Sequence, residues 1–412
     1  MSGRKTRVVG PQIDTAVFQK ALLKWYRVHA RKLPWRGAVD PYCIWLSEIM
    51  LQQTRVAAVI EHYHEFLHRF PSLVALALAS EQDVLAAWSG LGYYRRARML
   101  YKAAKFIAQE RGGILPSTSV ELRTLPGIGE YTSAAIASIA FGESAAVVDG
   151  NVERVLLRIT GRPEDHSSAS RASLRNTAQA LMPVSKSTST TKRSGNASPA
   201  KAPKRNPAGE HNQAMMELGA TICLPRSPLC LECPVFSLCH TRGEHPTKPR
   251  TKLRSREVAY LLSIRKRGTT TEVMLAKRAS EASLMPGMFE LPPLPFDAAS
   301  DEMADREPTL RIRHAITNTN YYVRIYAPKG PLDRVLRRAV PLAKADLTWV
   351  KASLLGTLPL TGLTRKVLQR LSVMAVPPLR DPKADRADKV PPKPKRPKKA
   401  AIVDHDEDHD QF

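Results

Sequence analysis

The sequence predicts a mainly helical N-terminal domain over residues 1–245 and an α+β domain over residues 246–375. From Thr15 to Thr160, apolar residues recur at helical spacing. One such stripe consists of Val152, Val155, Leu156 and Ile159. After residue 246 the pattern changes to short β-prone runs with turns between them. These runs are Val258–Ile264, Glu272–Ala276 and Tyr321–Tyr326, and Leu363–Leu371 follows as a closing helix.

Two segments contain too few apolar residues to build a core. Residues 184–207 consist almost entirely of Ser, Thr, Lys, Pro and Ala, so we expect a disordered insertion there. The helical pattern resumes at His211 and ends near His240. Residues 376–412 are rich in Pro and Lys and finish in an acidic patch, which predicts a disordered tail.

The composition indicates a nucleic-acid-binding protein of the cytoplasm. The formal net charge of the 412 residues is +25, and a field of that sign attracts nucleic acid; the alternative is an ordinary enzyme with a basic tail. The first ten residues have no apolar run after them, and no apolar stretch is long enough for a membrane span. We therefore expect no signal peptide and no contact with a membrane.

Four of the five cysteines fall within residues 223–239, which excludes a disulfide scaffold. Cys223, Cys230, Cys233 and Cys239 have the spacing C-x6-C-x2-C-x5-C. Zinc sites of four cysteines usually consist of two close pairs, and only one close pair occurs here. A [4Fe–4S] cluster tolerates uneven spacing, so the sequence favours one such cluster over zinc or free thiols. Because protein ligands fill all four positions, we expect a structural or DNA-sensing role.

A tight turn and two carboxyl groups are candidates for phosphate binding and for cleavage of a glycosidic bond. In Leu125–Gly129, the backbone N–H groups of Gly127 and Gly129 are able to approach a phosphate; the alternative is a simple helical corner. Glu48 lies on an apolar helix stripe, where desolvation raises its pKa, unless it pairs with Arg36. Asp149 precedes a helix and either caps it or borders a pocket. A protonated Glu facing an ionised Asp is the pair that cleaves glycosidic bonds.

These residues together resemble the MutY-type adenine DNA glycosylases of the helix-hairpin-helix, Gly/Pro-Asp superfamily. The resemblance extends from Phe18 to Leu371, without the insertion. Besides the hairpin and the cysteines, the motifs that carry it are Leu33-Pro34-Trp35-Arg36, Trp45-Leu46-Ser47-Glu48, Leu51-Gln52-Gln53-Thr54, Gly90-Leu91-Gly92-Tyr93-Tyr94, Val148-Asp149-Gly150-Asn151-Val152 and Asn212-Gln213-Ala214. The resemblance implies base excision repair of adenine opposite 8-oxoguanine or guanine in double-stranded DNA.

The resemblance also implies a role for each matched residue. Glu48 would protonate N7 of adenine, and Asp149, with Asn151 beside it, would stabilise or trap the cationic sugar. Tyr131 would support this chemistry. The adenine pocket would be lined by Arg36, Trp35 and Gln213. The residues that wedge into the duplex and touch the orphaned base would be Gln53, Thr54, Leu91 and Tyr93. For Leu91 and Tyr93, core packing is the alternative.

Position 131 separates the subfamilies of these enzymes. Bifunctional relatives have a Lys two residues after the last Gly of the hairpin, and this chain has Tyr131 there, so we expect hydrolysis without strand cleavage. Two alternatives remain at this point. One is a glycosylase for oxidised pyrimidines, which Tyr131 and the C-terminal domain disfavour. The other is a non-catalytic iron–sulfur DNA-binding module, which Glu48 and Asp149 disfavour.

The C-terminal domain is similar to the Nudix-like module with which the family recognises 8-oxoguanine. It has no Glu-rich Nudix catalytic box, so we expect no pyrophosphate hydrolysis. Where the family usually has Phe-Ser-His, this chain has Ile316-Thr317-Asn318, and Thr317 keeps the hydroxyl for contact with the lesion. We expect a cytoplasmic, nucleoid-associated monomer.

Overall fold

The structure is a computed structural model that describes residues 13–38, 40–165, 167–184, 206–245, 253–294, 307–316, 318–327 and 346–375. The tail expected at 376–412 and residues 185–205 of the expected insertion lie outside these ranges. Within the described part of the chain, no helix is both long and apolar enough to cross a membrane.

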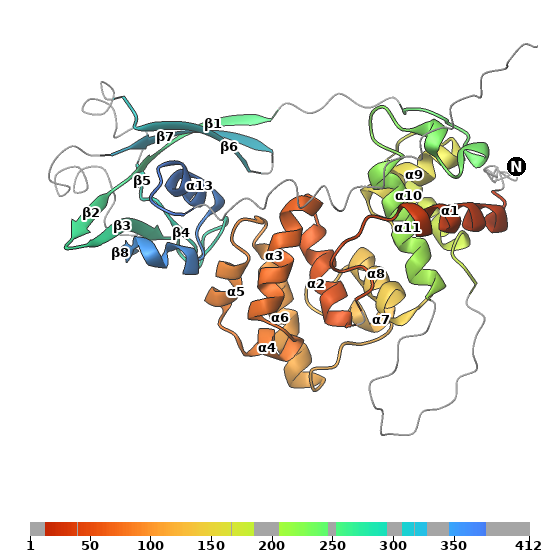
Figure 1. The fold of residues 1–412 in the computed structure, drawn as a ribbon, viewed down its shortest axis with the longest axis horizontal. Helices are drawn as coiled ribbons and strands as arrows, with labels where there is room; N and C mark the ends of the chain where they lie inside the picture. The colour runs from red at the N-terminus through yellow and green to blue at the C-terminus, as the bar shows by residue number, and fades with distance from the viewer. Residues whose placement is uncertain are drawn as a thin grey trace, which may run out of the picture. The chain divides into compact units, whose positions relative to one another are not determined.

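In the N-terminal part, all regular elements among the described residues are helices or 3₁₀ turns (Figure 1). Its α-helices are α1 (Thr15–His29), α2 (Pro41–Leu51), α3 (Val56–Arg69), α4 (Leu73–Leu78), α5 (Glu81–Ala87), α6 (Arg95–Glu110), α7 (Ser119–Leu122), α8 (Glu130–Phe141), α9 (Gly150–Thr160), α10 (Ser168–Ala180) and α11 (Pro207–Thr221). Two 3₁₀ turns follow, η1 (Cys230–Glu232) and η2 (Phe236–Leu238).

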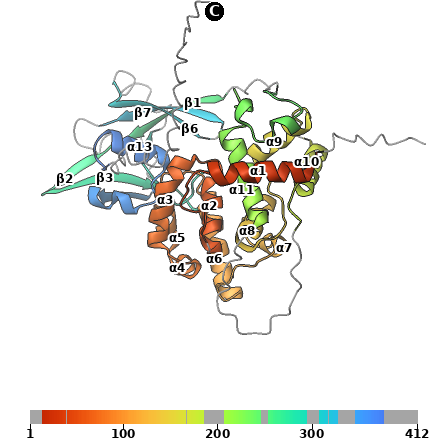
Figure 2. The same cartoon turned by 45° about the vertical axis from the view of Figure 1, so that its right-hand side comes forward.

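These helices form two lobes, each with its own apolar core. The first core lies among α2 to α8 and contains the fully buried Trp45 and Trp88. The second lies among α1, α9, α10 and α11 and contains Phe18 and Leu156. Helix α8 packs on both α2 and α11, so it connects the lobes, as both views show (Figures 1 and 2).

The start of α11 corrects the expectation that the helical pattern resumes at His211. The helix begins at Pro207, and the side chain of Asn206 accepts a hydrogen bond of 2.9 Å from the Gly209 N–H. An Asn cap before a first-turn Pro starts a helix without any apolar pattern. The expected insertion 184–207 therefore extends two residues too far.

The C-terminal part is an α+β domain of two small sheets. Its elements are β1 (Arg254–Leu261), β2 (Ile264–Arg267), β3 (Thr270–Lys277), β4 (Phe289–Glu290), β5 (Pro293–Leu294), β6 (Leu310–Ile316), β7 (Thr319–Tyr326), β8 (Asp346–Lys351), η3 (Ala352–Thr357) and α13 (Gly362–Arg370). One sheet has the order β5-β1-β7-β6, and in the other β3 pairs with β2, β4 and β8.

The pairing within these sheets brings most of the buried apolar residues into one main cluster, beside a smaller one. Strands β1 and β7 run parallel, with Val258 opposite Val323, whereas the other pairs are antiparallel. One core cluster combines Val273 of the second sheet, Ile325 of the first and Val367 of α13. The run expected at 258–264 divides between the sheets, because β2 starts at Ile264. A helical domain followed by an α+β domain confirms the predicted fold class.

Candidate active site

Glu48 on α2 carries a buried carboxyl group whose pKa is strongly raised. Only 5% of the residue is exposed, and its Oε2 accepts a hydrogen bond of 2.6 Å from the Tyr131 hydroxyl. Burial is the main cause that raises the pKa of Glu48 to about 7. The charge of Asp149 raises it further, while Tyr131 and Arg36 lower it. This carboxyl group is therefore close to half protonated at neutral pH.

Tyr131 lies in the first turn of α8 and acts as the donor in this pair. Burial, followed by the nearby carboxylates of Glu48 and Asp149, raises the pKa of Tyr131. Its hydroxyl also lies 3.6 Å from Met216 Sδ on α11. The phenol therefore keeps its proton and fixes Oε2 of Glu48 in place.

The hairpin between α7 and α8 has the two-glycine turn that the sequence predicts. Gly127 has φ +75°, and a Cβ there would collide with the side chain of Met99. Gly129 is the N-cap of α8, and nothing lies within 4 Å of the position that a Cβ would occupy there. The first glycine is needed for packing, whereas the second leaves the start of α8 uncovered.

Asp149 caps α9 and borders the same cavity, so both uses considered for it from the sequence occur together. Its Oδ1 accepts a hydrogen bond of 2.7 Å from the Val152 N–H, and its Oδ2 accepts one of 3.2 Å from Asn151 Nδ2. Arg154 Nη2 donates to Asn151 Oδ1 at 2.8 Å, and Arg154 Nε donates to the carbonyl of Cys223 at 2.8 Å. A chain of hydrogen bonds thus joins the cysteine loop to Asp149.

Arg36 pairs with Glu217 of α11. The sequence offered a pairing of Arg36 with Glu48 as an alternative, and the structure does not have that pair. Glu217 Oε2 accepts two hydrogen bonds of 2.7 Å, one from Arg36 Nη2 and one from Arg31 Nη2. Burial opposes ionisation of Glu217, but the hydrogen bonds from these two guanidiniums outweigh it and lower its pKa to about 2. A permanently charged carboxylate therefore holds Arg36 against the cavity.

Gln213 and Trp35 lie on the same side of the cavity as Arg36. Tyr26 donates its hydroxyl to Gln213 Oε1 at 2.8 Å, and the Arg36 guanidinium lies 5.4 Å from the centre of the Tyr26 ring. The Trp35 ring is buried edge-on against Tyr63, with 5.4 Å between the ring centres. These contacts fix the side chains before any ligand enters.

Most of the predicted site residues line one cavity between the two helical lobes. Its volume is about 770 Å³, within the range of roughly 300–1,000 Å³ usual for small-molecule pockets. The predicted residues in its lining are Trp35, Arg36, Glu48, Gln53, Thr54, Gly127, Gly129, Tyr131, Asp149, Asn151 and Gln213.

Two of the predicted substrate-binding residues, Leu91 and Tyr93, do not line this cavity. Leu91 is 6% exposed and packs in the core of the first lobe, so the core-packing alternative describes its position. Tyr93 is 48% exposed on the loop before α6. It has φ +48°, and Gln53 has φ +56°, a backbone region that residues other than Gly seldom adopt. Thr317 lies outside the described residues.

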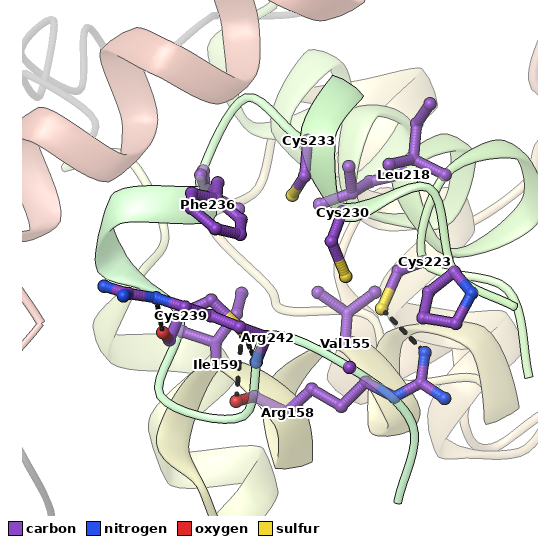
Figure 3. A pocket seen from close by; sticks show the side chains of 14 residues that line it. Val155, Arg158, Ile159, Leu218, Cys223, Cys230, Cys233, Phe236, Cys239 and Arg242 are labelled. Carbon is purple, nitrogen blue, oxygen red and sulfur yellow. Dashed lines mark hydrogen bonds between the residues drawn. The ribbon is translucent and has the colours of Figure 1, made fainter.

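The four clustered cysteines surround a second, apolar cavity. Cys223, Cys230, Cys233 and Cys239 line it together with Val155 and other apolar side chains. Figure 3 shows the sulfur atoms of Cys223, Cys230 and Cys233 directed into the space above Val155. Among the described residues, no group of three or more His, Cys, Asp or Glu side chains is arranged to hold a single metal ion.

Two nitrogen donors lie near the thiols, but burial opposes ionisation of the thiols. Arg158 Nη1 lies 3.4 Å from Cys223 Sγ, and the Arg242 N–H lies 3.5 Å from Cys239 Sγ. Burial, followed by the other cysteines, raises the pKa of Cys233 to about 11. Four thiolates in this space therefore need a bound cationic centre to remain ionised.

Reasoning from the sequence missed three arginine and glutamate contacts of the site. Glu217 and Arg31 hold Arg36, and Arg154 links Asn151 to the cysteine loop. Glu217 offers one usable signal, because it lies on the same helix four residues after Gln213, one turn away. Arg154 shares an amphipathic helix with residues of the core, and nothing in its spacing distinguishes it from a solvated residue.

Comparisons with known proteins identify the family of the chain. A family model described as "HhH-GPD superfamily base excision DNA repair protein" matches residues 46–179. The chain is 43% identical over 239 residues to an adenine DNA glycosylase of Homo sapiens, covering 56% of this chain and 40% of that protein. It is 33% identical over 258 residues to an adenine DNA glycosylase of Buchnera aphidicola subsp. Acyrthosiphon pisum (strain APS), covering 60% of this chain and 67% of that protein.

The matched part spans about two-fifths of the length of the mammalian relatives. A relative of Mycobacterium tuberculosis with the same name is 40% identical over 224 residues, covering 52% of this chain and 64% of that protein. The match with the superfamily model begins two residues before Glu48 and includes the hairpin and Asp149. The chain belongs to the adenine DNA glycosylase family of the HhH-GPD superfamily of base excision DNA repair proteins.

Proposed function

We propose that this chain is a monofunctional adenine DNA glycosylase. It would hydrolyse the N-glycosidic bond of adenine paired with 8-oxoguanine or guanine in double-stranded DNA. The observation that carries the proposal is the buried carboxyl group of Glu48, with its pKa near 7, in one cavity with Asp149. The name shared by its relatives supports adenine as the substrate base.

In this proposal Glu48 is the general acid. Its carboxyl proton passes to N7 of the extruded adenine, so that adenine leaves as a neutral base. Tyr131 donates to Oε2, which leaves the other carboxyl oxygen to carry the proton. Burial of Glu48 keeps a large protonated fraction available at neutral pH.

Asp149 is the stabiliser of the sugar cation that forms as the bond to adenine breaks. Its Oδ2 is held by Asn151, which is in turn held by Arg154. A water molecule then adds to C1′ of the sugar and releases its proton to a carboxylate, which completes hydrolysis. Tyr131 has no amine to form a Schiff base, so the phosphodiester strand stays intact.

The remaining cavity residues recognise the base and the duplex. Arg36, Trp35 and Gln213 would contact adenine, and the open start of α8 at Gly127 and Gly129 would receive a phosphate. Gln53, Thr54 and Tyr93 would enter the duplex and fill the place of the extruded base. We do not include Leu91 among these wedge residues, because it is packed in the core.

We propose that Cys223, Cys230, Cys233 and Cys239 hold one [4Fe–4S] cluster. The thiols surround a shared space rather than a single point, and a cluster with four separated corners fits that better than one zinc ion. When bound, the cluster would supply a cross-link and a redox-active centre. The donors from Arg158 and the Arg242 amide would stabilise its charged sulfur ligands.

The C-terminal domain would act as a Nudix-like module that reads 8-oxoguanine, with Thr317 as one contact. Its strands β1 and β6 carry the exposed residues Arg254, Arg256, Arg311 and Arg313, and this positive charge favours DNA. The strand register places the first two on one face of the sheet and the last two on the other. We expect a monomer that works in the cytoplasm on the nucleoid.

A duplex excision assay tests this function. Labelled duplexes with A opposite 8-oxoguanine, A opposite G, A opposite T and an oxidised pyrimidine opposite G are incubated with the protein and analysed with and without alkali. We expect cleavage only after alkali and only for the first two duplexes. Release of the pyrimidine, or strand cleavage without alkali, would contradict the proposal, as would binding of all four duplexes without excision.

A further inference from the structure

Arg96, in the first turn of α6, connects the two wedge loops, residues 52–55 after α2 and residues 89–94 before α6. These loops carry Gln53, Thr54 and Tyr93, the side chains proposed to enter the duplex. We propose that Arg96 is a positioning residue that holds both loops together, so that they extrude adenine as one rigid element. This inference rests on the proposed function and assigns one step of it, extrusion, to a residue outside the cavity.

On the first wedge loop, Arg96 completes the end of α2. Its Nη1 donates to three main-chain carbonyls there, those of Ile49 at 2.8 Å, Met50 at 3.0 Å and Gln52. Carbonyls in the last turn of a helix have no amide partner of their own. Its Nη2 donates to Thr54 Oγ1 at 3.1 Å, so the guanidinium spans the turn that contains Gln53.

On the second wedge loop, the same guanidinium lies behind Tyr93. Its Nη2 is 3.4 Å from the carbonyl of Leu91 and 3.3 Å from that of Gly92. Its central carbon lies 5.3 Å from the centre of the Tyr93 ring and 5.6 Å from that of Trp88. Tyr93 is half exposed, so Arg96 supports its inner face while the outer face stays accessible.

The backbone of both wedge loops needs such support. Gln53 and Tyr93 have φ +56° and +48°, and a residue other than Gly in that region costs about 1 kcal/mol or more. Extrusion of a stacked base costs a few kcal/mol. A loop that changes its conformation when it contacts the base stack would therefore extrude the base poorly. One planar guanidinium that bonds to both loops opposes that relaxation. A lysine at this position has one charged nitrogen and lacks the planar fork.

The test measures extrusion separately from bond cleavage. The Glu48→Gln protein, for which we expect excision to be about 10³-fold slower or more, is mixed with a duplex in which 2-aminopurine replaces the target adenine opposite guanine. The fluorescence of 2-aminopurine rises when the base leaves the stack. We expect the additional change Arg96→Lys to reduce this rise by at least about twofold at saturating protein, while the Kd for the duplex changes less than about threefold. The inference would be overturned if the double variant gave the same fluorescence rise as Glu48→Gln alone. It would also be overturned if duplex affinity and the fluorescence rise fell by the same factor.

Arg69→Lys in the same background is the matched control. Arg69 also lies over an aromatic ring, Phe70 at 5.7 Å, and makes one side-chain bond, to Asp83 at 2.7 Å, but it touches neither wedge loop. We expect it to leave the fluorescence rise unchanged. Circular dichroism monitors the fold, and Arg96→Gln replaces Arg96→Lys if the latter is unfolded, with the same two outcomes.

The test also separates this inference from the proposed function. If the proposed function fails, the unmodified protein does not excise adenine and the Glu48→Gln protein shows no fluorescence rise. If only the positioning role of Arg96 is wrong, excision and the rise are both present and Arg96→Lys leaves the rise unchanged.

Discussion

Two glutamates face the same cavity from opposite lobes, and their surroundings drive them to opposite states. Glu48, on α2, has one hydroxyl partner and a pKa raised to about 7, whereas Glu217, on α11, has two guanidinium partners and a pKa lowered to about 2. Both side chains are buried, at 5% and 1% exposure, so burial alone does not separate them. The partners decide which carboxyl group keeps a proton.

This difference gives the two sides of the cavity different roles: the side with Glu48 donates a proton, and the side with Glu217 fixes arginine side chains. A protonated carboxyl group is a donor for a leaving base, and a permanent carboxylate is a support for cations. Glu217 fixes Arg36 and Arg31 beside the place proposed for adenine. The comparison predicts that substitutions of the two glutamates affect different observables.

The largest expected effect is on the chemistry of Glu48. Glu48→Gln removes the acid but keeps the size of the side chain, so single-turnover excision of adenine should fall by about 10³-fold or more. Duplex binding, measured by fluorescence anisotropy, should stay within about threefold. Excision near the unmodified rate would remove Glu48 from the mechanism.

The next effect is on stability and comes from Glu217. Glu217→Gln leaves Arg31 and Arg36 without their shared carboxylate and should lower the free energy of unfolding by about 3 kcal/mol, measured in urea at pH 7. The stabilising charge of Glu217 is complete above its ordinary pKa near 4.5 and is lost as the pH falls towards 2. The difference between Glu217→Gln and the unmodified protein should therefore shrink below pH 4.

A surface pair provides the control for that measurement. Glu210, which lies on α11 like Glu217, accepts a hydrogen bond of 2.6 Å from Arg27 of α1, and both side chains are partly exposed. Glu210→Gln should therefore change stability by less than about 1 kcal/mol. Equal losses for Glu210→Gln and Glu217→Gln would mean that the buried position of Glu217 has no special importance.

Glu48 should show the reverse dependence of stability on pH. Its raised pKa means that the folded protein binds this proton more tightly than the unfolded chain, so its ionisation destabilises the fold as the pH rises from about 4.5 through 7. Glu48→Gln should therefore be more stable than the unmodified protein at pH 8, by on the order of 2 kcal/mol, and similar to it at pH 4. A variant less stable at pH 8 than at pH 4, relative to the unmodified protein, would contradict this sign.

The smallest effect concerns Tyr131. Its hydroxyl lowers the pKa of Glu48, so Tyr131→Phe should move the alkaline limb of the excision profile to higher pH, by about one unit or less. The profile is measured under single-turnover conditions. A limb that moves to lower pH would show that Tyr131 acts on Glu48 in another way.

The sequence predicts the parts of this site that depend on local pattern. The apolar stripe around Glu48 implies burial, and the two glycines of the hairpin imply a tight turn, and the structure has both features. The same holds for the order of helices and strands. The contact between Arg36 and Glu217 was not predictable, because the two residues are 181 positions apart and meet only when the lobes pack. The spacing of Glu217 from Gln213 indicates that they share a helix face, but not which residue Glu217 binds.

Three other features could not be predicted from local sequence pattern: the burial of Leu91, the first residue of α11 and the contacts of Arg96. Leu91 looks the same in sequence whether it faces DNA or the core, and only the packing of the first lobe decides. Asn206 starts α11 by a side-chain cap rather than by apolar spacing. Arg96 binds both wedge loops through main-chain carbonyls, which every residue has, so its contacts leave no trace in sequence.

The pH dependence of the single-turnover excision rate tests most directly the claim that Glu48 donates the proton. The account predicts a rate that falls above about pH 7 with a limiting slope of about tenfold per pH unit, because only the protonated carboxyl group is active. A rate that stays constant from pH 6 to pH 9, or one that rises over that range, would contradict it.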